Sequence, residues 1–337
     1  MSAVLFSHRF HLVSGGTLVD GAAGQGTAIE PIVLPADPAK RLDADACQRV
    51  EIAYFSEDVV PDFARQFFSA CFKAGRLRWL HAFNAGTDHP VFAQMLERGV
   101  RVTTSSGANA GPVGVTAAAG MLMLARGFPR WLAAQRRHAW EPLRGESVPE
   151  DLGGQTLLLV GLGEIGKTLA RIAQALGMRV IGVRRSNRQP GDPVDEMHPP
   201  AALDQLLPRA HWLALTCPLT DETRRLIGAE RLALLPKGAR IVNVARGEII
   251  DERALIAALE SGHLGGAYLD VFEQEPLPAG SPLWDLPNVV LSPHNAAASG
   301  GNVARATAMF LRNLALEARG EPMLNEVVAG ARGIQRR

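Results

Sequence analysis

Short apolar runs alternate with amphipathic stretches from about residue 151 to residue 299. TLLLVG at 156–161 is a continuous apolar run, which is typical of a strand covered on both faces in a parallel sheet. Further strands are predicted at 178–183, 211–216 and 239–245, and in GAYLDV and NVVLSP. Helices are predicted between them: one ending near Leu176, then AALDQLL, TDETRRLI and DERALIAALESG, the last with Asp251 as N-cap. This alternation predicts a doubly wound α/β domain with a parallel sheet.

The pattern is weaker in residues 1–108. AVLF near the start, EIAYF at 51–55 and RLRWLHAF at 76–83 are predicted strands. PDFARQFFSACFKAG at 61–75 has helical apolar spacing and is predicted to end at a capping Gly75. The glycine-rich stretch 14–31 has no pattern that assigns it. Residues 303–319 are predicted to form a helix that packs away from the regular domain.

Length and charge narrow the function classes. A chain of 337 residues fits two domains, and 47% hydrophobic with 20% charged residues is typical of a globular protein with substantial cores. The net charge of +1 gives no reason to expect nucleic acid or an anionic membrane as a partner. These features favour an enzyme that acts on small molecules.

The three cysteines, Cys47, Cys71 and Cys217, are scattered and form no CxxC pair. The sequence therefore predicts no disulfide framework, no metal site and a reducing compartment. The first residues place His8, Arg9 and His11 where a signal peptide would have its apolar core. The most apolar helical run, 113–125, is much shorter than the ~20 residues that span a bilayer. We expect a cytoplasmic protein.

The motif GLGEIG follows the 156–161 strand directly and opens the next helix. Gly161 permits a tight turn, Gly163 lets the backbone approach a pyrophosphate, and Gly166 lets helix and strand pack closely. The loop N–H groups, with Glu164 and Ile165 among the predicted cofactor contacts, then face the phosphates at the positive end of the helix dipole. A purely structural turn is the alternative, but the strand–loop–helix context favours dinucleotide binding.

The end of the following strand indicates which dinucleotide is bound. An NAD site carries Asp or Glu about 20 residues further on, to bind the ribose 2′-hydroxyl. This chain has GVRRSNR there, with Arg184, Arg185 and Ser186 at the turn. Guanidinium groups and a hydroxyl bind a 2′-phosphate by charge-assisted hydrogen bonds, whereas a carboxylate would repel it. Unless the segment is only a solvated basic turn, the sequence predicts NADP(H) in preference to NAD(H).

Three polar residues stand at or just past predicted strand ends. Arg246 follows IVNVA, Glu275 lies in DVFEQEP, and His294 lies in LSPHNAA. Loops beyond the carboxyl ends of strands face the ligand crevice of an open α/β sheet. Each residue alone has an ordinary alternative: a solvated histidine, a helix lead-in or a Glu-Pro turn.

Together and in this order, the motifs resemble the D-isomer-specific 2-hydroxyacid dehydrogenase family, and within it the glyoxylate and hydroxypyruvate reductases. The resembling segments are GLGEIG, CPLTDETRRLIG, LLPKGARIVNVARGEIIDERAL, GAYLDVFEQEPLP, LWDLPNVVLSPH, MFLRNLALEARGEP and, more loosely, NAGTD at 84–88. The resemblance implies a Rossmann domain, residues 109–297, inserted into a smaller flavodoxin-like α/β substrate domain formed by residues 1–108 and 298–337.

The resemblance also implies an activity, namely reduction of a small 2-keto acid of the glyoxylate or hydroxypyruvate type to its D-2-hydroxy acid. Arg246 would hold the carboxylate and the keto oxygen, because its planar fork suits bidentate contact. His294 would donate a proton, and Glu275 would orient the imidazole and raise its pKa. The backbone N–H groups of Ala85 and Gly86 would complete the carboxylate site.

Further cofactor contacts follow from the same resemblance. Asp270 and the carbonyl of Ala245, next to Arg246, would bind the carboxamide, and Cys217 and Pro218 would lie beside the nicotinamide ribose. Cys217 is otherwise a packing residue, so it is assigned contact and no chemistry.

A homodimer is also implied. The helix at about 111–126 would lie in its interface, with ordinary core as the alternative, and Trp140 would reach toward the partner subunit. The chain departs from the family at Val115 and Thr116, where a Glu-His pair is usual.

Two other functions remain open. A dehydrogenase fold can serve as a dinucleotide sensor that turns over little and binds protein partners, because function resides in the site rather than in the fold. A phosphite dehydrogenase-like oxidoreductase would carry the same type of triad.

Overall fold

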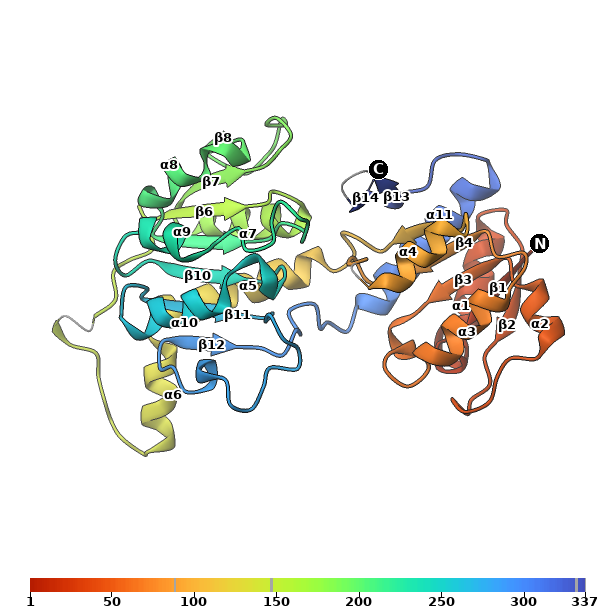
Figure 1. Ribbon diagram of the computed structural model, residues 1–337, viewed down its shortest axis with the longest axis horizontal. Coiled ribbons are helices and arrows are strands. Elements are labelled where there is room, and N and C mark those ends of the chain that lie inside the picture. Colours follow the sequence, from red (N-terminus) through yellow and green to blue (C-terminus); the bar gives the residue numbers. More distant parts are fainter. Residues whose placement is uncertain (88, 146–147, 331–332, 337) are drawn as a thin grey trace. The chain divides into compact units, whose positions relative to one another are not determined.

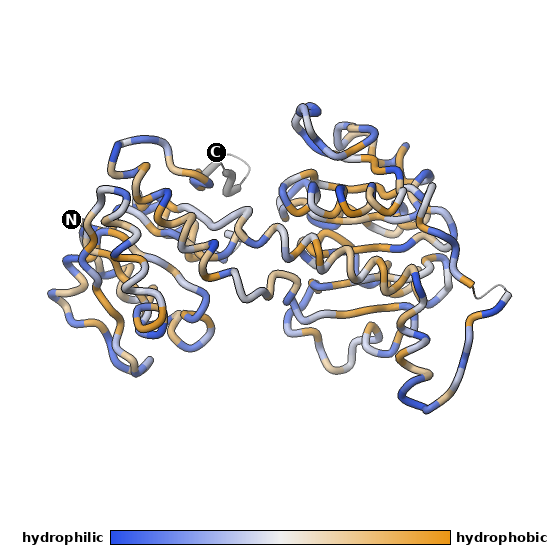
Figure 2. The backbone as a smooth tube through the Cα atoms, turned by 180° about the vertical axis from the view of Figure 1, so that it is seen from behind, coloured by the Kyte–Doolittle hydropathy of each residue, from blue (hydrophilic) through white to orange (hydrophobic). Residues whose placement is uncertain are grey.

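The computed structural model describes residues 1–87, 89–145, 148–330 and 333–336. The chain forms two compact units, one of Met1–Asn109 with Ser299–Arg337 and the other of Ala110–Ala298 (Figure 1). Each unit is built on a seven-stranded sheet. Figure 2 shows apolar residues concentrated along the strands and hydrophilic residues on many of the connecting loops.

The unit Ala110–Ala298 contains a fully parallel sheet with strand order β12-β11-β10-β9-β6-β7-β8. Its strands are β6 (Thr156–Val160), β7 (Arg179–Val183), β8 (Glu196–His198), β9 (Trp212–Leu215), β10 (Arg240–Asn243), β11 (Gly266–Leu269) and β12 (Val289–Leu291). Four of the five β6 residues are buried, as the apolar run predicts. The strand order reverses between β6 and β9, where doubly wound folds bind ligands. The prediction of a Rossmann domain is confirmed.

Helices cover both faces of this sheet. They are α5 (Ala110–Ala125), α7 (Glu164–Ala175), α8 (Leu203–Leu206), α9 (Ala229–Leu234) and α10 (Glu252–Glu260), whereas α6 (Phe128–Arg136) follows α5 and buries only Ala134. One apolar core joins the sheet to α5 and α7, and a second joins it to α8, α9 and α10. Asp251 caps α10, as expected, by accepting a hydrogen bond of 3.0 Å from the Ala254 N–H.

The helix predicted for TDETRRLI does not form. Its backbone makes turns, because the Thr223 hydroxyl binds the Thr220 N–H at 2.7 Å and the Pro218 carbonyl at 2.7 Å. Arg225 then adopts a positive φ of 51° and its N–H binds the Glu248 carbonyl at 2.7 Å. Backbone partners outside the segment therefore replace the helical hydrogen bonds.

The other unit has the strand order β14-β13-β5-β4-β3-β1-β2. Strands β1 (Ser2–Phe6), β2 (Ile29–Val33), β3 (Ile52–Phe55), β4 (Trp79–Ala82) and β5 (Arg101–Thr104) are parallel, whereas β13 (Glu326–Gly330) and β14 (Gly333–Arg336) are antiparallel. The order β2-β1-β3-β4-β5 is the flavodoxin-like one, so this prediction is confirmed too. Its helices are α1 (His8–Gly24), α2 (Ala44–Arg49), α3 (Ala64–Lys73), α4 (Pro90–Glu97) and α11 (Asn302–Ala318).

Two details of this unit differ from the sequence patterns. The unassigned stretch 14–31 contains most of α1 and the start of β2. Helix α3 ends at Lys73 with an extended Ala74, and Gly75 does not take the left-handed conformation expected of a capping glycine. The side-chain amide of Gln48 instead binds the Lys73 carbonyl at 3.1 Å.

Candidate active site

The phosphate loop between β6 and α7 is shaped by close backbone packing. Gly161 has a φ of 97°, and a Cβ there would lie 2.6 Å from the Cys217 nitrogen. A Cβ on Gly166 would lie 2.4 Å from the Gly161 carbonyl oxygen. At Gly163 a Cβ would meet no atom within 4 Å, and no side chain caps the first turn of α7. The result is an open cradle before the N-terminal N–H groups of α7, which fits a pyrophosphate.

A basic turn follows β7 and borders a cavity. Its lining residues are Arg184, Arg185, Ser186, Asn187, Arg188, Met197, His198 and Pro199. The Arg185 side chain is 63% exposed, with its guanidinium 3.8 Å from the Glu222 carboxylate. Arg184 instead lies 2.8 Å from the buried Asp192 carboxylate. The residues predicted to select the dinucleotide therefore lie together, but in different electrostatic settings.

The three predicted catalytic residues lie on loops that leave the same edge of the sheet. Arg246 follows β10, Glu275 follows β11 and His294 follows β12, and these strands are parallel neighbours. Gly247 permits the first two loops to touch, because a Cβ at this position would lie 1.9 Å from the Phe272 carbonyl carbon. The Arg246 guanidinium donates a hydrogen bond of 2.7 Å to the Ala245 carbonyl.

Glu275 and His294 form a hydrogen-bonded ion pair. Oε2 of Glu275 lies 2.6 Å from Nδ1 of His294, and Oε1 accepts a bond of 3.0 Å from the Phe272 N–H. The bond to Glu275 raises the pKa of His294 and outweighs the opposing effects of burial and of Arg246. Although burial acts in the other direction, the bonds from His294 and Phe272 hold the pKa of Glu275 below its usual value. The pair favours an imidazolium whose Nε2 is not used by this contact.

Asp270 anchors the loop that carries His294. One of its carboxylate oxygens accepts from the Ser292 hydroxyl at 2.5 Å and from the N–H groups of Asn295 at 2.8 Å and Ala296 at 3.0 Å. The His294 N–H binds the Asp270 carbonyl at 2.8 Å, and His294 has a φ of 53°. The sequence resemblance had assigned Asp270 only a carboxamide contact.

Two further residues support this loop and had no role in the sequence predictions. The Tyr268 hydroxyl lies 2.7 Å from that of Ser292, and the Thr116 hydroxyl donates to the Ala296 carbonyl at 3.1 Å. Thr116, one of the two residues that replace the family's usual Glu-His pair, therefore has a structural role in this loop. Val115 beside it is 57% exposed. Ser292 could have been suspected from its place two residues before His294.

The remaining predicted contacts are distributed over both units. Cys217 and Pro218 follow β9; burial raises the pKa of the Cys217 thiol to about 11, which leaves it protonated and suited to contact alone. Ala85 and Gly86 belong to the other unit, in the loop after β4. There the Asn84 side-chain amide donates to the Gly86 carbonyl at 3.0 Å and shapes the loop.

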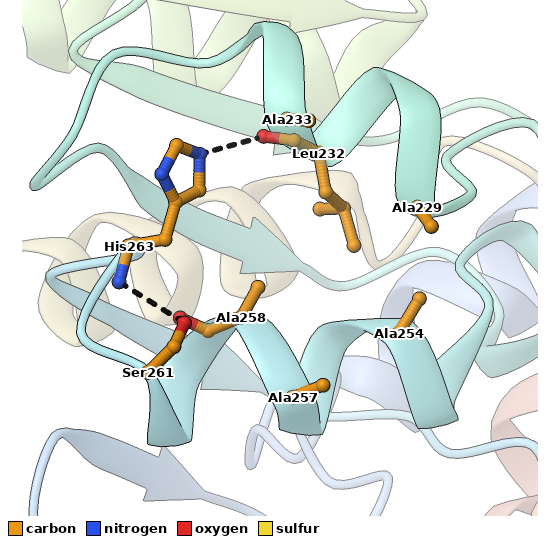
Figure 3. Close-up of a pocket in the computed structure, with 8 residues that line it drawn as sticks. All are labelled: Ala229, Leu232, Ala233, Ala254, Ala257, Ala258, Ser261 and His263. Atoms are coloured by element: carbon orange, nitrogen blue, oxygen red, sulfur yellow. Dashed lines mark hydrogen bonds between the residues drawn. The ribbon is translucent and has the colours of Figure 1, made fainter.

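A second hollow lies between α9 and α10 (Figure 3). Alanines dominate its lining, and the His263 ring lies 3.0 Å from the Leu232 carbonyl. Its described lining residues include no Lys, Arg, Asp or Glu side chain beside His263.

Metal and membrane signals are absent from the described part of the chain. Within those residues, no group of three or more His, Cys, Asp or Glu side chains could hold a metal ion, and no helix is long and apolar enough to cross a membrane. Cys47, Cys71 and Cys217 are buried free thiols.

Comparison with known proteins gives consistent matches. The profile for "D-isomer specific 2-hydroxyacid dehydrogenase, NAD binding domain" matches residues 118–296. A glyoxylate reductase of Korarchaeum cryptofilum is 36% identical over 258 residues, which cover 74% of this chain and 75% of that protein. A D-isomer specific 2-hydroxyacid dehydrogenase from Xanthobacter autotrophicus Py2, solved with NADPH and MES, gives a TM-score of 0.75 at 30% identity, with 97% of each chain covered. An NADPH-dependent glyoxylate/hydroxypyruvate reductase from Sinorhizobium meliloti, solved with NADP and sulfate, gives a TM-score of 0.74 at 26% identity, with 97% of this chain and 98% of the other covered.

Proposed function

The chain belongs to the D-isomer-specific 2-hydroxyacid dehydrogenase family, and from this premise we propose that it reduces a small 2-keto acid of the glyoxylate or hydroxypyruvate type to the D-2-hydroxy acid. The observation that carries the proposal is the ion pair between Glu275 and His294, on loops adjoining the one that carries Arg246. A carboxylate anchor, a carbonyl polariser and a proton donor are the groups that this reduction needs.

Each residue has a role that its chemistry supports. Arg246 binds the substrate carboxylate and polarises the keto oxygen through its guanidinium fork. His294, as imidazolium, donates the proton from Nε2 to the developing alkoxide, and Glu275 holds the ring and stabilises its charged form. Ala85 and Gly86 bind the carboxylate through their N–H groups. The bound dinucleotide supplies the hydride, and the open cradle before α7 fits its pyrophosphate.

NADP(H) is the proposed cofactor, in preference to NAD(H). The turn after β7 carries arginines where an NAD site would carry a carboxylate, and it borders a cavity. Two of the structural relatives named above were solved with NADPH or NADP. Gly161, Gly163, Glu164, Ile165 and Gly166 are proposed to hold the pyrophosphate.

At the nicotinamide end, Asp270 and the Ala245 carbonyl are proposed to bind the carboxamide, with Cys217 and Pro218 beside the ribose. Asp270 would combine this contact with its observed anchoring of the His294 loop.

A cytoplasmic homodimer completes the proposal. The three buried free thiols suit a reducing compartment. Large apolar side chains are exposed on and after α6: Phe128, Trp131, Leu132 and, at 95% exposure, Trp140. Exposed apolar groups of this size favour a partner surface, and light scattering of the eluting protein tests for a dimer.

The activity is tested by following oxidation of NADPH and of NADH at their nicotinamide absorbance with glyoxylate, hydroxypyruvate, pyruvate and bulkier 2-keto acids. We expect turnover with NADPH and a small 2-keto acid, and chiral analysis of the product should give the D-isomer. Tight NADPH binding without turnover of any of these acids would contradict the proposal and favour the sensor or a different substrate such as phosphite.

A further inference from the structure

The Arg184 side chain is committed to contacts within its own domain. Its guanidinium forms two hydrogen bonds with Asp192, at 2.8 and 3.4 Å. It also donates to the carbonyls of Leu162, at 3.4 Å, and Ser186, at 3.2 Å, and to that of Asn187. Arg184 therefore ties the phosphate loop at Leu162 to the turn at 186–187 and leaves its charge facing Asp192.

Asp192 needs this partner. Its side chain is 1% exposed, and its carboxylate accepts a bond of 2.7 Å from the Gln189 N–H. Burial acts to raise the pKa of Asp192, but the bonds from Gln189 and Arg184 hold it below the usual value. Lys167 lies further away, at 3.8 Å. A buried carboxylate that loses its main cation is strongly destabilised, so the exchange of Arg184 from Asp192 to a ligand would be costly.

Arg185 and Ser186 are placed differently. All three residues line the cavity at the end of β7, but Arg185 and Ser186 are exposed whereas Arg184 is only partly so. Arg185 has a distant, solvent-exposed carboxylate partner at 3.8 Å, and such a pair contributes little, about 0–1 kcal/mol. Its guanidinium can turn to a ligand at small cost, while the Ser186 backbone is held in place by Arg184.

We propose that Arg185 and Ser186 bind the 2′-phosphate of the cofactor and that Arg184 is a positioning residue which, paired with Asp192, holds the specificity turn against the phosphate loop. This division of roles differs from the simpler prediction that both arginines are phosphate ligands. It rests on the proposed preference for NADP(H). Substitution of a direct phosphate ligand should weaken the binding of NADPH alone. Substitution of a positioning residue that also contacts Leu162 should weaken the binding of both dinucleotides.

The test measures dissociation constants of NADPH and NADH by fluorescence titration of the full chain, without substrate. Arg185→Ala should weaken NADPH binding at least tenfold, as expected for a charge-assisted bond to phosphate, and leave NADH binding within about twofold. Ser186→Ala should act in the same direction with a smaller factor. Arg184→Met, which keeps the aliphatic stem, should weaken both dinucleotides by similar factors and lower the melting temperature.

Two further variants complete the set. Asp192→Asn should reproduce the pattern of Arg184→Met, because it removes the other half of the pair, and it stands in if Arg184→Met does not fold. Arg179→Ala removes the same charge from an exposed pair with Glu196 and should leave the affinity ratio unchanged.

Selective loss of NADPH binding in Arg184→Met, with NADH binding and melting temperature unchanged, would overturn the inference. So would an unchanged affinity ratio in Arg185→Ala. If the wild-type protein binds NADH as tightly as NADPH, the proposed cofactor preference and this inference both fail. If the wild-type protein prefers NADPH, the cofactor preference stands and the variants alone test the roles of Arg184, Arg185 and Ser186. A failure of the preference can therefore be told apart from a failure of this inference.

Discussion

Nδ1 of His294 lies 2.6 Å from Oε2 of Glu275, although 18 residues and a strand separate them in the chain. The pairing arises because β11 and β12 are parallel neighbours whose following loops meet at one edge of the sheet. A carboxylate at one ring nitrogen favours the charged imidazole and leaves the other nitrogen for the substrate. This pair supports the first prediction.

Reduction of the keto acid is predicted to fall as pH rises. His294 must be protonated, and the bond to Glu275 raises its pKa above the ordinary value of 6.5. The rate is therefore retained through pH 6.5 and lost as pH passes the raised value, while oxidation of the hydroxy acid shows the opposite trend. Single-turnover reduction with saturating NADPH measures this profile.

Glu275→Gln should shift the pH at which the reduction rate falls to a lower value, because the neutral amide no longer stabilises the imidazolium of His294. Glu273→Gln is the matched control, because its carboxylate lies in the same loop but binds the Glu252 N–H at 3.3 Å. If the reduction rate of Glu275→Gln falls at the same pH as that of the wild type, this carboxylate does not set the His294 pKa.

Gly247→Ala should lower kcat about 100-fold or more. The new Cβ would lie 1.9 Å from the Phe272 carbonyl carbon and would force the Arg246 loop away from the Glu275 loop. Displacement of a positioning group by about 1 Å can cost 100-fold. Gly228→Ala, with no atom within 4 Å of its Cβ, should retain wild-type kcat. Equal kcat in both variants would mean that the close approach is unimportant.

Ser292→Ala should lower kcat about fivefold, the loss expected when one hydrogen bond of about 1 kcal/mol no longer orders a catalytic loop. Ser292 connects the hydroxyl of Tyr268 to the carboxylate of Asp270, which in turn binds the loop N–H groups. Tyr268→Phe removes only the outer bond and should have a smaller effect. NADPH affinity measured in parallel separates loop order from cofactor binding, and a wild-type kcat in Ser292→Ala would remove this loop support from the account.

Strands β6, β7, β9, β10 and β11 could be predicted because nearly all of their residues are buried and read as continuous apolar runs. Strand β8 (Glu196–His198) was not predicted, because it is short, polar and only half-buried. The TDETRRLI segment could not be predicted either, since the N–H groups of Arg225 and Ile227 bind the distant carbonyls of Glu248 and Ile249. Helix α1 was not predicted, for a different reason. Its sequence HRFHLVSGGTLVDGAAG contains four glycines, which lower helix propensity, but its packing against α11 outweighs that cost.

Within the site, the positions of Arg246, Glu275 and His294 after strands made them candidates, and only the resemblance to the family gave them roles. The residues that hold these three in place could not be predicted from the sequence. Gly247, Ser292 and Thr116 act through contacts with residues far along the chain. The same applies to Arg184 and Asp192. The sequence shows the positive charge of Arg184, but it does not show that Asp192 is buried and pairs with it.

Acid should destabilise the flavodoxin-like unit through His81. Burial lowers the pKa of this histidine to about 3, and its ring nitrogens bind the hydroxyls of Thr103 at 2.7 Å and Ser105 at 3.0 Å. The unfolded chain takes up the proton first, so stability is lost as pH falls below 6.5, by up to about 1.4 kcal/mol per pH unit. Chemical denaturation at pH 7 and pH 4.5 should show a smaller acid loss in His81→Gln; an equal loss would exclude His81 as the cause.

The most direct test of the central claim is His294→Asn, with keto-acid reduction and NADPH affinity measured on the same preparation. Asparagine tolerates the positive φ of 53° at this position, so the loop backbone should be kept. We expect a fall in kcat of about 100-fold or more, the contribution typical of a general acid, with NADPH affinity little changed. Full turnover in this variant would contradict the assignment of His294 as the proton donor.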